Sequence, residues 1–391
     1  MPKAACPFCF RRVDTSRLAF QCSNRGIKKC TLAEDQKRKD LTGNTAVSYR
    51  TFPAPPGRNA PAICPDCGAT ATRRACSQCH TAVPIDFVDS DSPMIGIVGS
   101  KGSGKTVLMT VLTKQLREVV GKRFGAAVRM ATDNPDGTQG IDAYKATREA
   151  TLYDGRSLPP PTNQNAAARR SPLVLLWQGM QARRIGGSRP MSTILSFVDT
   201  AGEDLTDLDT TFTLQYLTVC DGLIVALDPF ALPGARSRLN LPGAAVQTAD
   251  GTPLDVVARI TEVLRNELQV RKNKKIKIPV AMVFTKIDAF YELMDRGNPI
   301  MSAPSAVPVY QEVDGEAVHE HVRALLHEWD AGDIDIHMQL NYADFRFFAV
   351  SALGAEPDYV TRSVSTGGVR PHRVEDPILW LLAKEGTVAS V

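Results

Sequence analysis

The stretch "MIGIVGSKGSGKTVLM", residues Met94 to Met109, decides the fold of this chain. A short apolar run (94–98) enters a loop with three glycines, and Lys105 and Thr106 follow before a second apolar run. A chain accepts this density of glycine where its backbone must turn tightly and approach another group closely. The first run is typical of a buried strand, and apolar residues recur at helical spacing after the loop, as far as Gly121. Strand, Gly-x4-Gly-Lys-Thr and helix in this order predict a phosphate-binding loop, or P-loop.

The predicted P-loop contains the groups that bind nucleotide phosphates. Its backbone N–H groups and the N-terminus of the following helix would surround the phosphates. Lys105 would reach the β- and γ-phosphates, and the hydroxyl of Thr106 would bind Mg2+. The residues assigned to nucleotide binding in this loop are Gly99, Ser100, Lys101, Gly102, Ser103, Gly104, Lys105 and Thr106.

A second motif follows an apolar run further along the chain. "STILSFVDTAGED" (192–204) predicts a strand that ends at Asp199 and continues into Asp-x-x-Gly. The Asp199 carboxylate would hold the Mg2+ shell, and the N–H of Gly202 would face a γ-phosphate. The sequence therefore predicts a triphosphate ligand.

The third and fourth motifs concern the base. "IPVAMVFTKID" (278–288) predicts a buried strand that ends in Thr285, Lys286 and Asp288. A carboxylate can accept two hydrogen bonds from the N1–H and the 2-amino group of guanine, which adenine lacks, so Asp288 predicts guanine selection. "RFFAVSAL" predicts one more strand and a turn, and the turn residues assigned to the nucleotide are Ser351, Ala352 and Leu353.

With GSKGSGKT, DTAG, TKID and SAL in this order, residues 93–385 resemble a GTPase domain of the Ras-like TRAFAC class. The resemblance implies an α/β P-loop fold with a mostly parallel sheet, GTP or GDP with Mg2+ as ligands, and hydrolysis of GTP to GDP and phosphate. Thr285 stands where the family commonly has Asn. A general ATPase is disfavoured, because TKID would then have no purpose.

The family order places the first switch segment before a β-hairpin. Residues 171–180 and 191–199 flank "QARRIGGSRP" and predict that hairpin, so the switch lies within 122–170, which is long for the family. Thr162 is the favoured sensor of the γ-phosphate and a ligand of Mg2+. The rival threonines are Thr132, Thr138, Thr147 and Thr151.

One departure from the family concerns catalysis. Glu203 follows DTAG where a Ras-like enzyme commonly has the Gln that orients the attacking water. A carboxylate beside the γ-phosphate is repelled unless it is protonated or turned away, so slow intrinsic hydrolysis is expected. Alternatively, Glu203 simply begins the next helix, where acidic residues are favoured. A partner's arginine could raise the rate by ~10^3–10^5, and Arg169 and Arg170 are candidates within the chain. The assigned catalytic residues are Lys105, Thr162, Gly202 and Glu203.

Eight of the nine cysteines precede residue 80, and the ninth, Cys220, is expected to be a buried apolar residue. Such crowding in a chain without a secretory signal indicates metal more than disulfides. Grouped by sequence proximity, the cysteines predict two structural Zn2+ sites in zinc-ribbon-like modules. The first set is Cys6, Cys9, Cys22 and Cys30; the second is Cys64, Cys67, Cys76 and Cys79. Exchange of ligands between the sets remains open, and the CxxCH pattern of haem attachment at Cys76–His80 is disfavoured without an export signal.

The head at residues 1–88 is basic, since residues 1–90 hold 14 Lys and Arg against 7 Asp and Glu. Two four-thiolate zinc sites, each of net charge −2, would lower this balance of +7 to about +3. A solvated face is therefore favoured over a nucleic-acid grip for Lys28, Lys29, Lys37, Arg38 and Lys39.

The rest of the chain completes the predicted domains. A Pro-rich connector (52–63) argues against one compact fold across 31–63. "GLIVALD" (222–228) predicts a core strand, 254–271 an amphipathic helix, and 289–344 an insertion with a further helix. The histidines of that helix, His319, His321 and His327, lack the spacing of a metal site.

The zinc head and the ending "RVEDPILWLLAKEG" also resemble bacterial "double-GTPase"-type proteins, which implies a signalling or defence system. The sequence thus predicts a GTP-hydrolysing switch that acts through a protein partner, such as an activator or a second GTPase. No apolar run approaches the roughly 20 residues of a membrane span, so a cytoplasmic location is expected. The alternatives are a nucleotide-dependent scaffold without hydrolysis and a GTPase whose zinc head grips nucleic acid.

Overall fold

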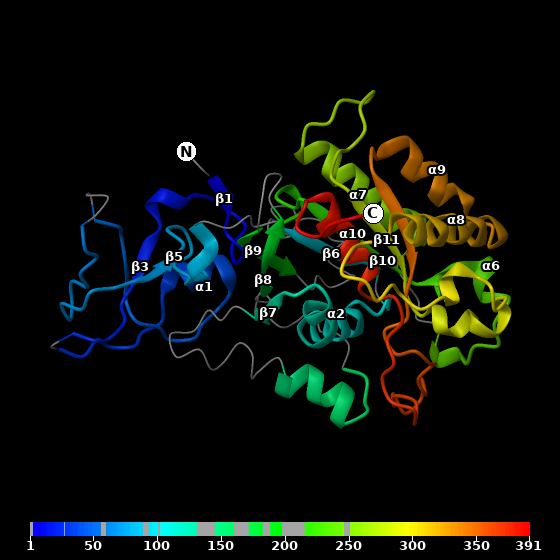
Figure 1. The fold of residues 1–391 in the computed structure, drawn as a ribbon, viewed down its shortest axis with the longest axis horizontal. Coiled ribbons are helices and arrows are strands. Elements are labelled where there is room, and N and C mark those ends of the chain that lie inside the picture. Colours follow the sequence, from blue (N-terminus) through cyan, green and yellow to red (C-terminus); the bar gives the residue numbers. More distant parts are fainter. Residues whose placement is uncertain are drawn as a thin grey trace. The chain divides into compact units, whose positions relative to one another are not determined.

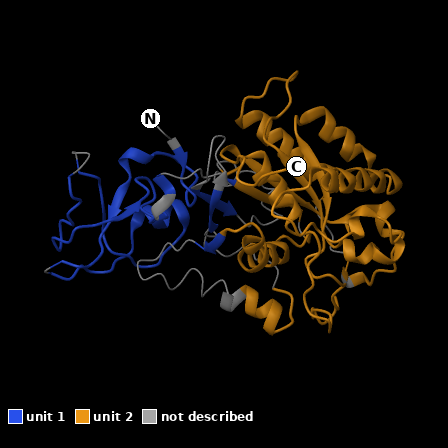
Figure 2. Cartoon of the chain, in the orientation of Figure 1, with its two compact units in different colours: residues 1–94, 127–145, 165–198 blue, residues 95–126, 146–164, 199–391 orange. Residues whose placement is uncertain are grey.

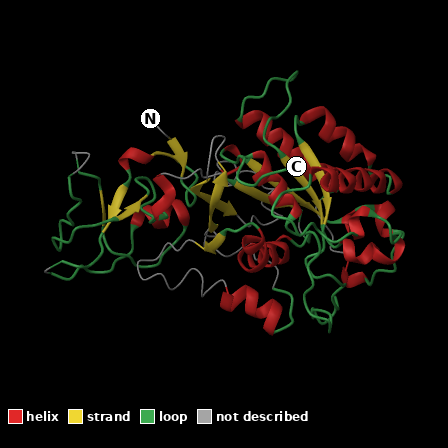
Figure 3. Cartoon of the chain, in the orientation of Figure 1, coloured by secondary structure: helices red, strands yellow, loops and turns green. Residues whose placement is uncertain are grey.

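The structure is a computed structural model of the 391-residue chain. It describes residues 3–26, 28–55, 60–88, 94–100, 102–130, 145–159, 172–182, 188–197, 216–245 and 251–391. The chain forms two compact units (Figure 2): unit 1 contains 1–94, 127–145 and 165–198, and unit 2 contains 95–126, 146–164 and 199–391. Most helices belong to unit 2 (Figure 3). None of the helices in the described ranges has the length and apolar character that crossing a bilayer requires.

The core of unit 2 is a parallel four-stranded sheet in the order β12-β11-β10-β6 (Figure 1). Its strands are β6 (Ile95–Gly99), β10 (Gly222–Leu227), β11 (Val280–Phe284) and β12 (Phe345–Ala349). Every residue of β6, β10 and β11 is buried, as expected for parallel strands covered on both faces. These four strands confirm the apolar runs predicted from the sequence.

Helices surround this sheet, with α8 packed on β12 and α10 on β10 and β11. The α-helices of unit 2 are α2 (Lys105–Gln115), α3 (Gly121–Arg123), α6 (Pro233–Arg236), α7 (Pro253–Glu267), α8 (Glu312–Glu328), α9 (Gly332–Asn341) and α10 (Asp376–Lys384). Short helical turns are η3 (Leu116–Val120), η6 (Pro229–Ala231), η7 (Gly243–Ala245), η8 (Ile287–Leu293) and η9 (Pro299–Met301), and the longer η4 spans Lys145–Asp154.

The predicted amphipathic helix corresponds to α7. It begins with a capping box, in which the hydroxyl of Thr252 accepts the N–H of Asp255 and the Asp255 carboxylate accepts the N–H of Thr252. The helix ends at Glu267, earlier than predicted, and Leu268 is 36% exposed rather than inward-facing.

Unit 1 contains three small antiparallel sheets. The strands are β1 (Lys3–Ala5) with β2 (Arg12–Asp14); β4 (Thr51–Phe52), β3 (Ala19–Gln21) and β5 (Arg73–Ala75); and β7 (Ala127–Met130), β8 (Leu173–Ala182) and β9 (Ser188–Phe197). The helical elements are α1 (Gln36–Thr42), η1 (Thr15–Arg17) and η2 (Ile85–Val88).

The predicted hairpin exists as β8 and β9. The expected boundary near residue 90 would place it in the nucleotide-binding domain, which is not where it belongs. It belongs to the same compact unit as the cysteine-rich head. Val174, Leu176 and Ile194 are buried in one core with Phe8 and Phe87 of the head. Hydrophobic contacts, rather than continuity along the chain, therefore define unit 1.

The Pro-rich connector also differs from expectation. Phe52 forms part of β4 and stacks with Phe20 of β3, with ring centroids 6.4 Å apart. Ala62 is buried in the same core. The segment on either side of residues 56–59 is thus built into the head instead of separating two modules.

Candidate functional site

The glycine-rich loop, residues 99–106, leaves β6 at a point of close backbone contact. A Cβ atom on Gly99 would lie 2.1 Å from the carbonyl oxygen of Ala226 on β10, so no larger residue fits there. Gly104 is the N-cap of α2 with φ of 74°, a left-handed conformation that glycine adopts without strain. The glycines therefore place the loop between the end of β6 and the start of α2, as the sequence predicts.

Lys105 is buried beside this loop. Its Nζ donates hydrogen bonds to the carbonyl oxygens of Gly99 at 2.7 Å and Ser100 at 2.9 Å. Ser103 adds a hydrogen bond from its hydroxyl to the Ser100 carbonyl at 2.8 Å. The loop thus holds the ammonium group against its own backbone.

Thr285 connects the loop to the sheet. Its Oγ1 donates to the carbonyl of Ser103 at 2.8 Å and lies 3.2 Å from the carbonyl of Leu227 at the end of β10. The side chain is only 4% exposed. A hydroxyl at this position thus anchors the glycine-rich loop to the end of β11.

Replacing Thr285 by Val should weaken nucleotide binding while the fold persists. The substitution keeps the branched shape but leaves the carbonyl of Ser103 without this donor, at a cost of about 1–3 kcal/mol. Part of this cost should appear in stability and part in affinity, as a loss of roughly five- to tenfold. The measurement is the dissociation constant of fluorescent GTP together with a urea unfolding curve. Thr285→Ser, which keeps the hydroxyl, is the matched control; equal affinity of the Val and Ser variants would contradict this role.

Lys286 and Asp288 follow with different surroundings. Lys286 has a left-handed backbone, and its Nζ lies 2.7 Å from Oδ2 of Asp228 and 4.8 Å from the centre of the Phe230 ring. Burial raises the pKa of Asp288 above its usual value, and a hydrogen bond from Ser351 opposes the shift. A partly desolvated carboxylate gains most from a ligand that donates hydrogen bonds to it.

One pocket of unit 2, with a volume of about 140 Å³, unites three of the four predicted motifs. From these motifs it is lined by Gly102, Gly104, Thr285, Lys286, Asp288, Ala352 and Leu353. The remaining lining residues were not assigned to the nucleotide from the sequence; they are Val107, Leu108, Leu158, Ala245, Val350, Pro357 and Tyr359. A mostly apolar space with one carboxylate in its wall suits a flat heterocycle that carries N–H donors.

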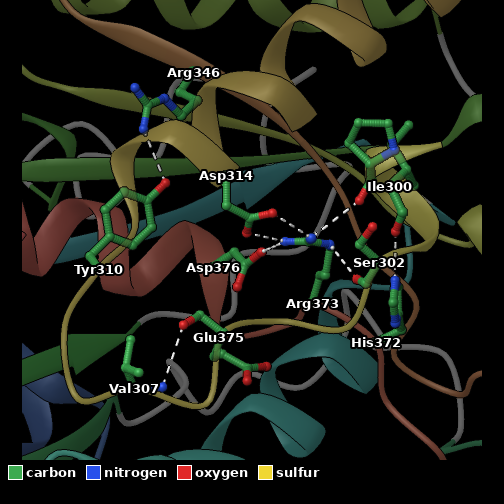
Figure 4. A network of polar contacts seen from close by, with 12 residues as sticks. Ile300, Ser302, Val307, Tyr310, Asp314, Arg346, His372, Arg373, Glu375 and Asp376 are labelled. Atoms are coloured by element: carbon green, nitrogen blue, oxygen red, sulfur yellow. Dashed lines mark hydrogen bonds and ion pairs between the residues drawn. The ribbon is translucent and has the colours of Figure 1, made fainter. Parts of the chain in front are cut away.

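The turn at residues 351–354 is linked through His372 to the predicted insertion, residues 289–344. Ser351 and His372 exchange backbone hydrogen bonds of 3.0 and 2.8 Å, and Nε2 of His372 lies 2.6 Å from the carbonyl of Ile300. The neighbouring Arg373 is 1% exposed and binds both carboxylate oxygens of Asp314, at 2.8 and 2.9 Å (Figure 4). The polar network thus joins the insertion to the turn that lines the pocket.

Arg373 also donates from Nη1 to Oδ2 of Asp376 at 2.7 Å and from Nε to the carbonyl of Ser302 at 3.0 Å (Figure 4). A planar guanidinium with five donors suits this buried convergence of carboxylates and carbonyls. Asp314 belongs to helix α8, which thereby joins the network. His319 of α8 accepts the backbone N–H of Phe347 at 2.9 Å, which is a structural contact.

Several predicted site residues lie outside the described part of the chain. They are Lys101, Thr162, Asp199, Gly202 and Glu203, together with the rivals Thr132 and Thr138 and the candidates Arg169 and Arg170. Their roles remain predictions. Thr147 and Thr151 belong to η4.

Unit 1 contains two clusters of four cysteines, but their membership differs from grouping by sequence proximity. One cluster, site A, consists of Cys6, Cys9, Cys76 and Cys79; the other, site B, consists of Cys22, Cys30, Cys64 and Cys67. The predicted sets were therefore wrong, and the ligands are exchanged between them. The sites are nested, since both pairs of site B lie between the two pairs of site A along the chain.

Antiparallel pairing of β3 with β5 explains the nesting. Ala19 pairs with Ala75 and Gln21 with Arg73. Cys22, at the end of β3, therefore lies near the start of β5, whereas Cys76, at the end of β5, lies near the start of β3. Each end of the strand pair thus gathers its own four thiols.

The geometry of both clusters fits zinc. A tetrahedral Zn2+ with Zn–S bonds of ~2.3 Å requires sulfur atoms about 3.8 Å apart. In site A the Sγ atoms of Cys6 and Cys79 are 3.9 Å apart, as are those of Cys9 and Cys76. In site B the Sγ separations are 3.4 Å for Cys22 and Cys67, 3.5 Å for Cys22 and Cys30, and 3.6 Å for Cys30 and Cys64. Four thiolates leave no open position, so each site is suited to a structural ion rather than a catalytic one.

The backbone around the cysteines is shaped for such sites. The residues that follow the three CxxC pairs of the head, Phe10, Gly68 and His80, have positive φ of 60°, 72° and 60°. Their N–H groups donate to the carbonyls of Cys6, Cys64 and Cys76 at 2.9 Å. The N–H of Ala69 lowers the pKa of Cys67 to about 7, which favours the thiolate that a metal requires.

The basic residues of the head only partly form a solvated face. Lys28, Lys29, Lys37 and Lys39 are exposed, as predicted. Arg38, however, is fully buried, and its guanidinium donates to the carbonyl of Ala46. One of the basic side chains considered for nucleic-acid contact is thus part of the interior.

Comparisons with known proteins add the following. No protein-family model matches the chain. The chain is 27% identical over 423 residues to SaeC of Mycolicibacterium smegmatis, across 98% of this chain and 99% of that protein, for which a role in ESX-1 scaffolding and assembly has been proposed.

Among solved structures, the chain resembles a signal recognition particle receptor complex, SRb-GTP/SRX, from Chaetomium thermophilum. The identity is 17%, over 68% of this chain and 93% of that chain, with a TM-score of 0.28. The GTP-bound GTPase-like domain of S. cerevisiae Ski7 is 12% identical over 77% of this chain and 52% of that chain, with a TM-score of 0.33. TM-scores this low do not establish a shared fold. The candidate site is therefore defined by the geometry of the pocket alone.

Proposed function

We propose that unit 2 binds GTP with Mg2+ and that the protein hydrolyses GTP to GDP and phosphate as a slow molecular switch. The observation that carries this proposal is the single pocket lined by glycine-rich loop residues, by Asp288 and by the 351–354 turn. Sequence motifs far apart in the chain meet there in the arrangement that one nucleotide would need.

Selection of guanine would depend on Asp288. Its carboxylate would accept hydrogen bonds from the N1–H and the 2-amino group of guanine, and adenine would leave the desolvated group without donors. Ala352 lines the same pocket, and its backbone would offer further polar groups to the base edge. Thr285 would keep the glycine-rich loop in register with this base site through its bond to Ser103.

Phosphate binding would depend on the loop and on Lys105. When the phosphates occupy the loop, the Lys105 ammonium would turn from the Gly99 and Ser100 carbonyls toward the β- and γ-phosphates. Thr106, Thr162 and Asp199 would hold Mg2+, which neutralises charge between the phosphates when bound.

Hydrolysis would need an attacking water in line with the γ-phosphate. The N–H of Gly202 would stabilise charge on the γ-phosphate, and Glu203 would be a poor substitute for a water-orienting Gln. We therefore expect slow turnover that a partner's arginine accelerates.

The biological setting would be assembly with other proteins. SaeC has a proposed scaffolding and assembly role, and the alignment covers nearly the whole of both chains. This protein would accordingly act as a nucleotide switch on protein partners in a bacterial signalling or defence system. The two zinc ions would be structural, and the protein would act in the cytoplasm. The same likeness favours a second candidate, a nucleotide-dependent scaffold that turns over little GTP.

Titration of the full chain with fluorescent GTP and ATP in Mg2+, followed by phosphate release from the same sample, tests the proposal. GTP-selective binding with measurable turnover is the expected result. Selective binding without turnover, even after addition of candidate partners, would favour the scaffold. Preference for ATP, or no binding of either nucleotide, would overturn the proposal.

A further inference from the structure

We propose that Arg373 is a positioning residue for base selection. It fixes residues 370–373, here called the supporting segment, which pairs with the 351–354 turn and through that turn holds Asp288 toward the base. This inference rests on the proposed function, because it concerns the same pocket. All of these residues belong to unit 2. Arg373 is not among the described residues that line the pocket, so it would act on the base through its neighbours.

The guanidinium of Arg373 has an acceptor for each of its five N–H donors (Figure 4). Nη1 donates to Oδ2 of Asp314 at 2.8 Å and to Oδ2 of Asp376 at 2.7 Å. Nη2 donates to Oδ1 of Asp314 at 2.9 Å and to the carbonyl of Pro299 at 3.1 Å. Nε donates to the carbonyl of Ser302 at 3.0 Å. A planar group bound on every side has one position, and lysine, with three donors, cannot reproduce it.

His372, the residue before Arg373, binds the same part of the insertion. Its Nε2 donates to the carbonyl of Ile300 at 2.6 Å, and its ring meets Tyr291 of η8 edge-on, with centroids 5.9 Å apart. Carbonyl groups at the end of a helix are commonly satisfied by donors from outside it. The side chains of residues 372 and 373 together bind three carbonyls in and next to η9, those of Pro299, Ile300 and Ser302.

The supporting segment pairs closely with the turn. Ser351 and His372 form an antiparallel bridge, with N–H to carbonyl distances of 3.0 and 2.8 Å. The N–H of Arg370 donates to the carbonyl of Leu353 at 2.8 Å. A Cβ atom on Gly354 would lie 2.0 Å from the carbonyl oxygen of Arg370, so there is no free space between the two segments. A displacement of the supporting segment would therefore move the turn.

The turn in its place contacts the carboxylate that would select the base. The hydroxyl of Ser351 accepts the N–H of Gly354 at 2.7 Å and hydrogen-bonds the carboxylate of Asp288. The N–H of Ile287, next to Asp288, donates to the carbonyl of Val350 at 3.3 Å. Hydrogen bonds to a charged group are strong only at short distance and good angle. A moved turn would thus change where the carboxylate points and how well it meets two donors of guanine.

Arg346 offers a matched comparison within the same unit. Like Arg373, it binds acidic residues in the first turns of α8, with 2.8 Å to Glu312 and 3.0 Å to Glu316. It also donates to the hydroxyl of Tyr310 at 3.1 Å. None of these three partners belongs to the turn or to the supporting segment, so loss of their contacts should affect stability without affecting base selection.

The test compares the triphosphates of guanosine and inosine, which differ only in the 2-amino group of the base, as competitors of fluorescent GTP in Mg2+. In the wild-type chain we expect GTP to bind ~10- to 100-fold more tightly, since that amino group donates to Asp288. Arg373→Lys keeps a positive charge between two carboxylates but cannot satisfy all five acceptors. Its preference for GTP over the inosine nucleotide should fall about five- to tenfold. Arg346→Lys should lower the midpoint of urea unfolding and leave the preference unchanged.

The ratio of two affinities does not depend on the fraction of folded protein, so a purely structural role of Arg373 would leave it unchanged. Asp314→Asn keeps Arg373 and weakens one of its contacts; the ratio should fall in the same direction by less, and this variant carries the test if Arg373→Lys does not fold. A wild-type ratio in the folded variant, or an equal fall in Arg346→Lys, would overturn the positioning role alone. Absence of GTP binding to the wild-type chain, or equal affinity for both nucleotides, would instead overturn the proposed base selection, and this inference with it.

Discussion

Replacing Asp288 by Asn should change the preferred purine of the pocket from guanine to xanthine. The Asn side chain keeps one acceptor for the N1–H of the base but places an amide donor opposite position 2. Guanine has an amino group there and would be repelled, whereas xanthine has an oxygen that accepts the donor. Loss of hydrogen bonds to a charged acceptor costs about 3 kcal/mol or more, so GTP affinity should fall at least about 100-fold.

Competition between fluorescent GTP and the triphosphates of guanosine, xanthosine and adenosine measures this change in base preference. Recovered affinity for xanthosine triphosphate shows that the variant is folded, which serves as the internal control. Because burial raises the pKa of Asp288, wild-type GTP affinity should also fall as the pH is lowered and the carboxylate becomes protonated. The Asn variant should lack this dependence. Unchanged GTP affinity in Asp288→Asn would remove Asp288 from the base site.

Removal of zinc should unfold unit 1, including the hairpin that lies about 100 residues beyond the last head cysteine. Binding of a structural Zn2+ contributes apparent free energies of about 10–16 kcal/mol to small domains, more than a head with two short sheets could replace. Since Val174, Leu176 and Ile194 share the core of site A, strands β8 and β9 should lose their protection together with the head.

Hydrogen exchange after treatment with a strong chelator checks this expectation. Peptides from 3–88 and from β8 and β9 should exchange faster, while β11 and β12 in the core of unit 2 should retain protection. The double variant Cys22→Ser, Cys67→Ser offers a milder comparison, because it disrupts site B and leaves the core shared with the hairpin. A hairpin that stays protected after both zinc ions are lost would contradict the composition of unit 1.

The strands of the unit 2 sheet could be predicted because each is encoded by a short stretch of neighbouring residues. Runs such as 94–98 and 278–284 are apolar, short and bounded by glycine or polar residues, and such runs become strands wherever the sheet buries them. The cysteine sites could not be predicted in the same way. Crowding and CxxC spacing identify which cysteines could hold a metal. The grouping of these cysteines into two sites depends on the antiparallel contact between β3 and β5, which the spacing does not encode.

The pocket likewise combines residues that the sequence could predict with residues that it could not. Its polar residues, such as Asp288, come from motifs whose chemistry requires particular residue types. Its apolar walls, such as Leu158 and Tyr359, come from segments where many side chains would serve. The backbone N–H of Leu158 donates to the carbonyl of Arg362, over 200 residues away in the sequence. No local sequence pattern predicts that contact.

The nesting of the cysteine sites also orders events during synthesis. A chain that emerges from the ribosome N-terminus first presents Cys6 and Cys9 before any other thiol, yet their partners arrive last, with Cys76 and Cys79. Site B is complete once Cys67 has emerged, and site A only afterwards. The apolar cover from β8 and β9 follows roughly 100 residues later still, at ~5–20 residues per second. Of the eight head cysteines, the first pair to emerge is thus the last to be shielded, with a delay of several seconds.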